Sequence, residues 1–367
     1  MKPYLALFYF AYFALVGVYV IFMPQVLLSF GYSKAEVGVI YFAAPFMRFL
    51  LPFIFKYFIP LTRDVYRLSL GLMLISTLIF IGTVEQFWLY LMVNLIFGAS
   101  MGISLPFVET IALEHLAKKE YGKIRLWGSV GFIVMALWLG KVLDEPSDAL
   151  YYLAGMAFLT LLVGIRLLDW VAEERHGTKE EASSFSLQRF WAFWVSIFLM
   201  QVAFGGFYNF FTIYELDHGV SLEMTSWMWT FGVICEIVML FFQGRLLQQN
   251  LLYLLQFATL VTVVRWLLLY FYAQSIGMTF VAQSLHAVSF ALYHTAMISY
   301  VFLLYAQKRL AQQFVLGIGF GLGGSLGALL SGKIYGEYLF LVEAIITLMA
   351  WGMLVLHARR VSSHRKL

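Results

Sequence analysis

Apolar residues fill most of this chain in long runs, and polar or charged residues fall in short clusters between them. The runs are about 20 residues long, which is the length that an α-helix needs to cross the hydrocarbon core of a membrane. We therefore predict an all-α membrane protein of twelve transmembrane helices, near residues 4–29, 36–58, 67–84, 87–116, 124–143, 149–169, 188–215, 223–243, 250–272, 277–305, 313–335 and 338–358. The first run has no signal-peptide cleavage site, so it counts as the first helix.

The composition agrees with this pattern and excludes a soluble globular domain. Hydrophobic residues make up 62% of the 367 residues and charged residues 12%, against about 45–50% and 25% in soluble proteins. Twelve helices with short turns use the whole length, so no room remains for a soluble domain of ordinary size. The single cysteine, Cys235, argues against a disulfide framework and a metal cluster, and we expect no metal and no cofactor.

An internal repeat predicts how the chain is divided. The longest polar segment, 169–187, separates residues 1–168 from residues 188–367, and each part holds six predicted helices. A shift of 188 residues places Gly31 on Gly219, Ser33 on Ser221 and Arg48 on Glu236. Because each serine precedes a predicted helix, we expect two serine N-caps. A parallel repeat of six helices is typical of facilitator-type transporters, which predicts two pseudo-symmetric six-helix bundles joined by a linker.

The basic residues in the predicted loops are unevenly distributed. With the N-terminus placed in the cytoplasm, nineteen lysines and arginines lie on the cytoplasmic side, and only Lys34, Lys141 and Lys333 lie on the other. Cytoplasmic loops of membrane proteins carry such an excess. We therefore expect a multi-pass protein of the inner (cytoplasmic) membrane, with both termini and the linker in the cytoplasm.

Small residues recur every four positions in two of the predicted helices. Gly319, Gly323 and Gly327 form such a stripe in the eleventh helix, and Gly98 and Gly102 form one in the fourth. Small residues at this spacing let neighbouring helices approach closely. The stripes therefore predict helix contacts and say nothing about what the protein binds.

Charged and histidine side chains within the apolar runs are the strongest functional candidates, because an ionised group at membrane depth is costly unless it is paired or hydrated. Arg48 and Glu236 lie near the middle of their predicted helices, and Arg265 lies in the outer half of the ninth helix. His286 and His294 are eight residues apart on the tenth helix, which places both on one face.

Each of these groups has a structural interpretation beside a functional one. Glu236 and Arg265 either form a pair that orders two helices, or Glu236 binds a proton on one side of the membrane and releases it on the other. Glu109 and Arg125 lie near the cytoplasmic ends of the fourth and fifth helices, where an ion pair would hold that side closed. Arg48 has no obvious acid at its depth in its own half and suits an anionic or hydroxyl-rich substrate.

Further polar and aromatic residues are candidates for contact with a substrate. They are Asn94, Tyr208, Asn209 and His294. Each either lines a cavity or packs between helices, and both interpretations stay open.

Several segments resemble a known family. The run YGKIRLWGSVGF at 121–132, which follows PFVETIAL at 106–113, resembles the phenylpropionate permease branch of the major facilitator superfamily. LHAVSFALYHTA at 285–296 and FGVICEI at 231–237 resemble the tenth and eighth helices of that branch. The resemblance implies the major facilitator fold and alternating access to a site near the middle of the membrane.

The order of the charged residues is also similar to that of the proton-coupled oligosaccharide symporters. Those proteins carry a glutamate, an arginine and a histidine on helices eight, nine and ten, and the matching residues here are Glu236, Arg265 and His286. They also pair an acid on helix four with an arginine on helix five, matched here by Glu109 and Arg125. The resemblance implies proton symport, with this second pair near the substrate. The next carboxylate of the symporters' helix ten is Ser289 here, so Glu236 would carry the proton alone or with His286.

Together these observations predict a secondary active transporter and not an enzyme, since the chain has no HExxH motif and its polar loops are too short to hold an active site. Our first hypothesis is proton-coupled uptake of a small organic solute, such as an aromatic or short-chain carboxylate. A sugar or nucleoside proton symporter and a drug exporter of the same fold are the alternatives. The expected partners are the solute, protons and the lipid bilayer, with no nucleic acid, and the expected state is a monomer.

Overall fold

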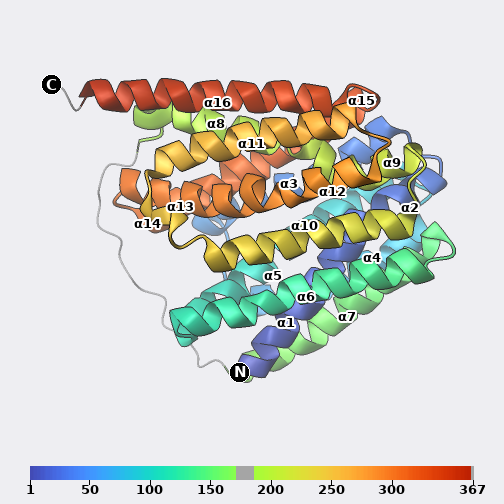
Figure 1. Ribbon diagram of the computed structural model, residues 1–367. Coiled ribbons are helices and arrows are strands. Elements are labelled where there is room, and N and C mark those ends of the chain that lie inside the picture. The colour runs from blue at the N-terminus through green and yellow to red at the C-terminus, as the bar shows by residue number, and fades with distance from the viewer. Residues whose placement is uncertain (171–185, 365–367) are drawn as a thin grey trace. The chain divides into compact units, whose positions relative to one another are not determined.

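The computed structural model describes residues 1–170 and 186–364, which are helical and contain no strand (Figure 1). Twelve helical segments in this part of the chain are long and apolar enough to cross a membrane. They are Lys2–Ser29, Lys34–Phe55, Arg63–Thr83, Phe87–His115, Glu120–Val142, Pro146–Leu168, Gln188–Asp217, Leu222–Phe242, Leu251–Phe271, Ile276–Leu304, Leu310–Ile334 and Leu339–Val361. The predicted all-α membrane fold is confirmed, and its helix bounds agree to within a few residues.

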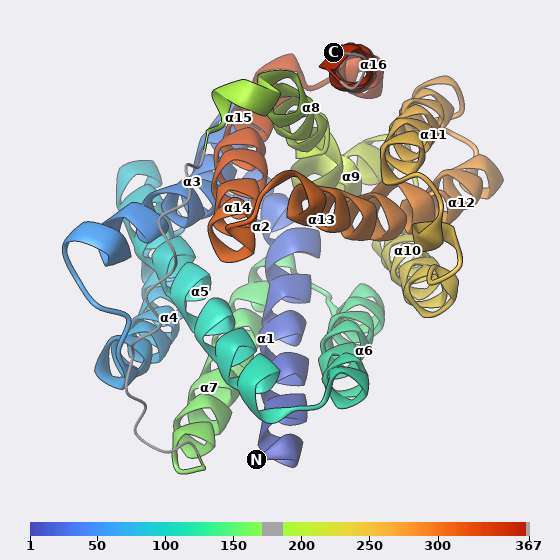
Figure 2. The same ribbon diagram turned by 90° about the vertical axis from the view of Figure 1, so that its left-hand side faces the viewer.

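The chain forms two compact units. The first comprises Met1–His176 and Tyr208–Thr230, and the second comprises Gly177–Phe207 and Phe231–Leu367. The first unit holds α1 (Lys2–Ile21), α2 (Met23–Ser29), α3 (Lys34–Tyr57), α4 (Arg63–Thr83), α5 (Phe87–His115), α6 (Lys118–Val142), η1 (Pro146–Asp148) and α7 (Ala149–Leu168). Within it, α1 packs against α6 and α7 (Figure 2).

The second unit holds η2 (Gln188–Phe190), α8 (Trp191–Val202), η3 (Leu246–Gln248), α11 (Leu251–Phe271), α12 (Ile276–Ser284), η4 (Ala287–Leu292), α13 (Tyr293–Leu304), α14 (Lys308–Phe314), η5 (Val315–Gly323), α15 (Gly324–Ile334) and α16 (Leu339–His364). Two further helices, α9 (Gly205–Asp217) and α10 (Leu222–Phe242), contribute residues to both units. The expected division into halves at 1–168 and 188–367 stays a prediction, and most of the expected linker, 169–187, lies outside the described residues.

The two expected serine N-caps are confirmed. Ser33 and Ser221 each accept a hydrogen bond from the backbone N–H three residues later, at 3.2 Å in both cases. Gly31 and Gly219, which precede them, have φ angles of +87° and +83°. Residues other than glycine rarely adopt this backbone conformation. The repeat therefore preserves both the turn and the N-cap at the start of α3 and α10.

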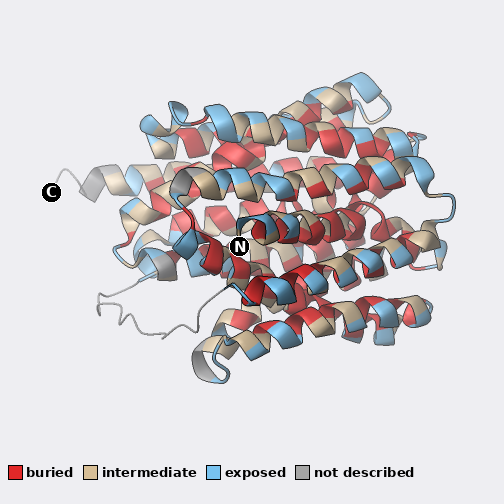
Figure 3. Cartoon of the chain, turned by 90° about the horizontal axis from the view of Figure 1, so that it is seen from below, coloured by how far each residue is buried: buried red, intermediate tan, exposed pale blue. Residues whose placement is uncertain are grey.

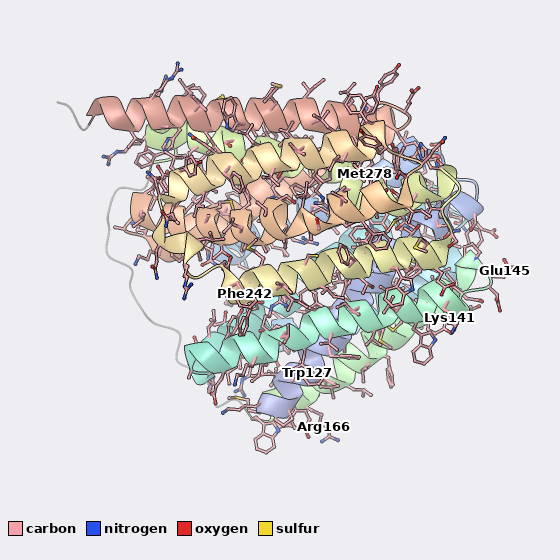
Figure 4. The ribbon with its side chains drawn as sticks, in the orientation of Figure 1. Trp127, Lys141, Glu145, Arg166, Phe242 and Met278 are labelled. Carbon is pink, nitrogen blue, oxygen red and sulfur yellow. The ribbon has the colours of Figure 1, made fainter. Side chains whose placement is uncertain are left out.

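Apolar side chains also cover the outside of the helices. Buried and exposed faces alternate along each helix (Figure 3). The exposed faces carry large apolar residues such as Trp127 of α6 and Phe242 of α10, which is 69% exposed (Figure 4). Lys141 lies near the end of α6 instead, close to Glu145 at the turn that follows (Figure 4). Apolar outer faces with charges at the helix ends fit a chain surrounded by lipid.

The predicted glycine stripes lie at close helix contacts. A Cβ atom on Gly323 would lie 2.9 Å from the carbonyl oxygen of Phe198, and one on Gly327 would lie 2.7 Å from that of Val202. In the first unit, a Cβ on Gly102 would lie 2.6 Å from Leu51. The eleventh helix therefore rests on the backbone of α8, where even a methyl group has no space.

This contact gives a prediction about stability. Replacing Gly327 by Ala pushes a methyl group against the backbone of α8, and overpacking of this kind costs about 1–3 kcal/mol. We expect the midpoint of thermal unfolding of the purified protein to fall by several degrees. Gly352→Ala on α16 is the matched control, because a Cβ there meets no atom within 4 Å. Equal midpoints for the two variants would contradict the close contact.

Four membrane-spanning helices are irregular, which the sequence did not predict. The first is interrupted at Phe22, between α1 and α2. The seventh is interrupted between the end of α8 at Val202 and the start of α9 at Gly205. The tenth and eleventh contain π-helical turns, at Ala287–Leu292 and Val315–Gly323. Such turns often occur at functional sites. The irregular segments of the seventh and tenth helices border the polar clusters described below.

Candidate functional site

Arg265 of α11 is the centre of a buried polar cluster in the second unit. The side chain is 0% exposed. Its Nη1 atom donates to Nδ1 of His286 at 3.0 Å and to the hydroxyl of Ser289 at 3.1 Å. Its Nη2 atom donates to Oε1 of Gln283 at 2.9 Å. Buried charges need such partners, and these three acceptors come from α12 and the π-helical turn η4 with the residue before it.

Aromatic rings complete the surroundings of the guanidinium. Its central carbon lies 4.1 Å from the ring centroid of Phe207 and 4.7 Å from that of Trp266. A cation over an aromatic face is stabilised by the ring quadrupole, and more strongly where water is excluded. The cluster therefore holds a fixed positive charge away from solvent.

The contact with Arg265 defines which ring nitrogen of His286 carries a hydrogen. A guanidinium only donates, so Nδ1 of His286 must accept, and the neutral ring then has its hydrogen on Nε2. That atom lies 3.7 Å from Oε2 of Glu236 on α10. His286 thus lies between the arginine and the glutamate and turns its N–H toward the carboxylate.

Glu236 differs from His286 in the exposed fraction of its side chain. Its side chain is 19% exposed, whereas that of His286 is 7% exposed. Cys235, the preceding residue on α10, is also half-buried. A partly exposed carboxylate that faces a histidine N–H can exchange a proton where water reaches it.

The two histidines of the tenth helix lie on one face, as predicted. The ring of Phe290 stacks on His286, with centroids 5.1 Å apart, and on His294 at 6.1 Å. His294 is half-buried and also contacts the ring of Phe320. The structure thus forms a column of three rings along η4 and α13, and a role for His294 in substrate binding stays a prediction.

The predicted pair of Glu109 and Arg125 forms in the first unit. Nε of Arg125 lies 2.9 Å from Oε1 of Glu109, and the hydroxyl of Tyr121 donates to Oε2 at 3.0 Å. The guanidinium also lies 4.2 Å from the ring centroid of Phe13. Both charged side chains are about one-third exposed, so the pair is open to solvent. Whether it contacts a substrate stays a prediction.

Arg48 is an exposed guanidinium in the middle of α3. A Cβ atom on Gly102 of α5 would lie 3.4 Å from Cγ of Arg48, so the stem of the side chain lies close to α5. Among the residues that the structure describes, it forms no ion pair. An exposed, unmatched positive charge within a membrane-spanning helix is available to an anion.

The remaining candidate residues for substrate binding differ in how deeply they are buried. Asn94 is fully buried, donates to the carbonyl oxygen of Ile40 at 2.7 Å and accepts from the hydroxyl of Tyr19 at 3.0 Å. This geometry favours its structural interpretation, in which it joins α1, α3 and α5. Tyr208 and Asn209 are half-buried on α9. The roles of all three in substrate binding stay predictions.

Sequence reasoning missed two buried carboxyl groups and one amide. Glu343 of α16 and Glu215 of α9 are 1% and 0% exposed, and Gln283 is a direct partner of Arg265. The two acids lie within apolar runs, and that signal alone would have justified naming them. Across the described residues, no group of three or more histidine, cysteine or acidic side chains is placed to hold a metal ion.

Twelve helices long and apolar enough to cross a membrane, together with the family match below, define a multi-pass membrane transporter of the major facilitator type. The chain belongs to the MFS_1 like family, whose model matches residues 3–342. It is 26% identical over 367 residues to the "Probable 3-phenylpropionic acid transporter" of Escherichia coli (strain K12), and the alignment covers 95% of both chains.

Two further comparisons agree with this assignment. The "Uncharacterized transporter YwbF" of Bacillus subtilis (strain 168) is 26% identical over 285 residues, which are 73% of this chain and 69% of the relative. The crystal structure of the nucleoside transporter NupG matches with a TM-score of 0.80 at 17% identity, covering 97% of this chain and 98% of that chain. This second likeness shows the fold alone. The predicted superfamily is confirmed, and the protein is a transporter and not an enzyme.

Proposed function

We propose that the protein couples the uptake of a small organic carboxylate, aromatic or short-chain, to the entry of protons. The main support is Arg48, an exposed guanidinium at membrane depth that forms no ion pair among the described residues. The E. coli relative, which is named as a probable transporter of an aromatic acid, supports the same class of substrate.

Arg48 suits a carboxylate because a guanidinium offers two parallel N–H groups that match the two carboxylate oxygens. The stem of its side chain lies against Gly102 of α5, which supports a position facing the helices of its own unit. A cation in such a place is costly until an anion binds it. We therefore assign Arg48 to the carboxylate group of the substrate.

The proton belongs to the cluster of Glu236, His286 and Arg265. In this proposal Glu236 takes a proton from water, and the Nε2–H of His286, 3.7 Å away, stabilises the ionised form after release. Arg265 holds His286 in the required tautomer through the 3.0 Å contact with Nδ1. One proton and one monovalent carboxylate then cross together without net charge, while the two halves of the fold rock about the site.

The same proposal includes the orientation in the membrane. The excess of basic residues in alternate loops supports an inner-membrane protein with both termini in the cytoplasm. The even number of membrane-spanning helices, twelve in the described residues, supports placing both termini on the same side.

The test uses proteoliposomes that contain the purified protein and an internal pH dye. Pooled carboxylates, sugars and nucleosides are added in turn. We expect acidification of the interior with the carboxylate pool and not with the others. Entry of labelled carboxylate without acidification would instead indicate uniport or coupling to another ion.

A substitution at Arg48 tests the substrate assignment. Loss of one partner of a hydrogen-bonded charge pair costs about 2–5 kcal/mol, which is about 30-fold or more in affinity. We expect Arg48→Gln to reduce carboxylate uptake by at least this factor at low substrate concentration, and Arg48→Lys to retain part of it. Arg67→Gln is the control, since Arg67 is an exposed residue of α4 that pairs with Asp64. Uptake by Arg48→Gln at the wild-type rate would show that Arg48 does not bind the substrate.

A sugar or nucleoside symporter is the second candidate, favoured by one observation. Glu109, Arg125 and the hydroxyl of Tyr121 form a partly exposed polar group that suits a hydroxyl-rich substrate. Acidification with sugars or nucleosides, and none with carboxylates, would favour this alternative.

A further inference from the structure

Glu343 of α16 is a buried carboxyl group that the mechanism above does not use. Its Oε1 atom accepts from the backbone N–H of Gly206 and from the hydroxyl of Ser331, the latter at 3.4 Å. Its Oε2 atom is enclosed and has no hydrogen-bond partner among the described residues. An enclosed carboxylate oxygen without a donor is costly, so this group is not explained by packing alone.

The partner of Glu343 lies at the interruption of the seventh membrane-spanning helix. α8 ends at Val202 and α9 begins at Gly205, so the N–H of Gly206 belongs to the first turn of α9, where N–H groups lack partners within the helix. A Cβ on Gly206 would lie 2.9 Å from the carboxyl carbon of Glu343, which means that the carboxyl group reaches this turn only because residue 206 is glycine.

The turn also lies where the chain passes between its two compact units. Residues up to Phe207 belong to the second unit, and Tyr208 is the first residue that belongs to the other. The contact between Glu343 and Gly206 is internal to the second unit. Gly206 lies one residue before Phe207, the last residue of that segment of the unit. A change in the contact therefore acts on the segment that joins the units.

Few charged groups among the described residues lie near Glu343. α16 packs on α8 and α11 (Figure 1), and α8 carries no ionisable side chain. α11 contributes Arg265, which attracts the carboxylate electrostatically, and α15 contributes Ser331, while Lys333 on α15 is exposed. The start of α9 and Arg265 favour the ionised carboxyl group, and the enclosed Oε2 atom favours the protonated one. Opposing influences of this kind let a small change in the surroundings decide whether a proton is bound.

We propose that Glu343 is a second proton-binding site of the transporter, and that a proton on Oε2 loosens the first turn of α9. The proton comes from water and returns to water, and no other covalent bond changes. A neutral carboxyl group is a weaker acceptor than a carboxylate, so proton binding weakens the hydrogen bond from Gly206. The inference rests on the proposed proton coupling and adds a conformational role to it.

Hydrogen–deuterium exchange of the full-length protein in lipid nanodiscs, without substrate, tests the first step. The readout is protection of the Gly206 amide across a pH series, after correction for the intrinsic pH dependence of exchange. Loss of a cap at a helix start changes local opening about fivefold, so we expect protection to fall by about this factor as pH falls. In Glu343→Gln, whose amide oxygen is a neutral acceptor, protection stays low at every pH.

Two further variants keep this test decisive. Glu215→Gln, the same change at a buried residue later in α9, is the matched control and follows the wild type. Ser331→Ala removes a donor to Oε1 and moves the midpoint of the transition. Protection that does not vary with pH in the wild type, or that varies equally in Glu343→Gln, overturns the inference, and so does an unmoved midpoint in Ser331→Ala.

Transport separates this inference from the proposed function. With proton coupling intact in the wild type, we expect Glu343→Gln to exchange labelled substrate and to lose concentrative uptake. A wild type that shows the pH-dependent protection but no substrate-driven acidification would contradict the proposed coupling and leave Glu343 as a proton site. Wild-type concentrative uptake by Glu343→Gln would overturn the role of Glu343 and leave the coupling in place.

Discussion

We expect the replacement of Glu236 by Gln to abolish substrate-driven acidification of proteoliposomes and to leave exchange of labelled substrate. The amide has nearly the same shape as the carboxyl group and still faces Nε2 of His286, but it binds no proton. We expect concentrative uptake to fall by about 100-fold or more, the scale on which groups that transfer protons act. We expect exchange to persist because, in the proposed mechanism, substrate binding and the conformational change do not require a proton to be released.

The control for this prediction lies on the same helix. Glu223 is an exposed acid in the first turn of α10, and Glu223→Gln should leave both assays unchanged. Acidification by Glu236→Gln at the wild-type rate would assign the proton elsewhere. Loss of exchange together with acidification would instead place Glu236 in substrate binding.

Replacing Arg265 by Met is expected to damage both folding and coupling. The variant removes the donor to three buried acceptors, on His286, Ser289 and Gln283. Breaking a buried charge network by deleting one partner costs about 3–5 kcal/mol. Differential scanning fluorimetry should show a large fall in the unfolding midpoint, and the properly folded fraction should show no substrate-driven acidification.

Arg265→Lys separates the two effects. A lysine keeps the charge but presents no planar fork, so it reaches only part of the three acceptors. We expect intermediate stability and impaired coupling. Arg245→Met, at an exposed arginine that follows α10, is the control and should resemble the wild type. Wild-type stability and coupling in Arg265→Met would show that the cluster has neither role.

The fold could be predicted from the sequence because its signals are local. Helix length and hydrophobicity gave the twelve membrane-spanning segments, and the pairs of glycine and serine before α3 and α10 gave their N-caps. The interruption at Gly205 and the π-helical turn at Ala287–Leu292 were not predicted. Their residues are as apolar as the regular helices around them, and the irregular backbone depends on the neighbouring helices.

The candidate site was predicted in part for the same reason. The sequence identified Glu236, Arg265 and His286 as costly groups within apolar runs, and the structure brings all three together. It did not show that the histidine lies between the other two, or that Gln283 completes the cluster. Glu343 carried the same local signal, an acid within an apolar run, but its contact with the first turn of α9 joins residues that are remote in sequence.

Cys235, the only cysteine of the chain, lies half-buried beside Glu236 on α10. A thiol reagent therefore modifies a single position of the unaltered sequence, and no cysteine-free background has to be engineered first. The rate of alkylation at this sulfur reports how freely water reaches that part of α10. The native chain thus carries its own chemical reporter, with which the effect of substrate and pH on this part of α10 can be followed in the purified protein.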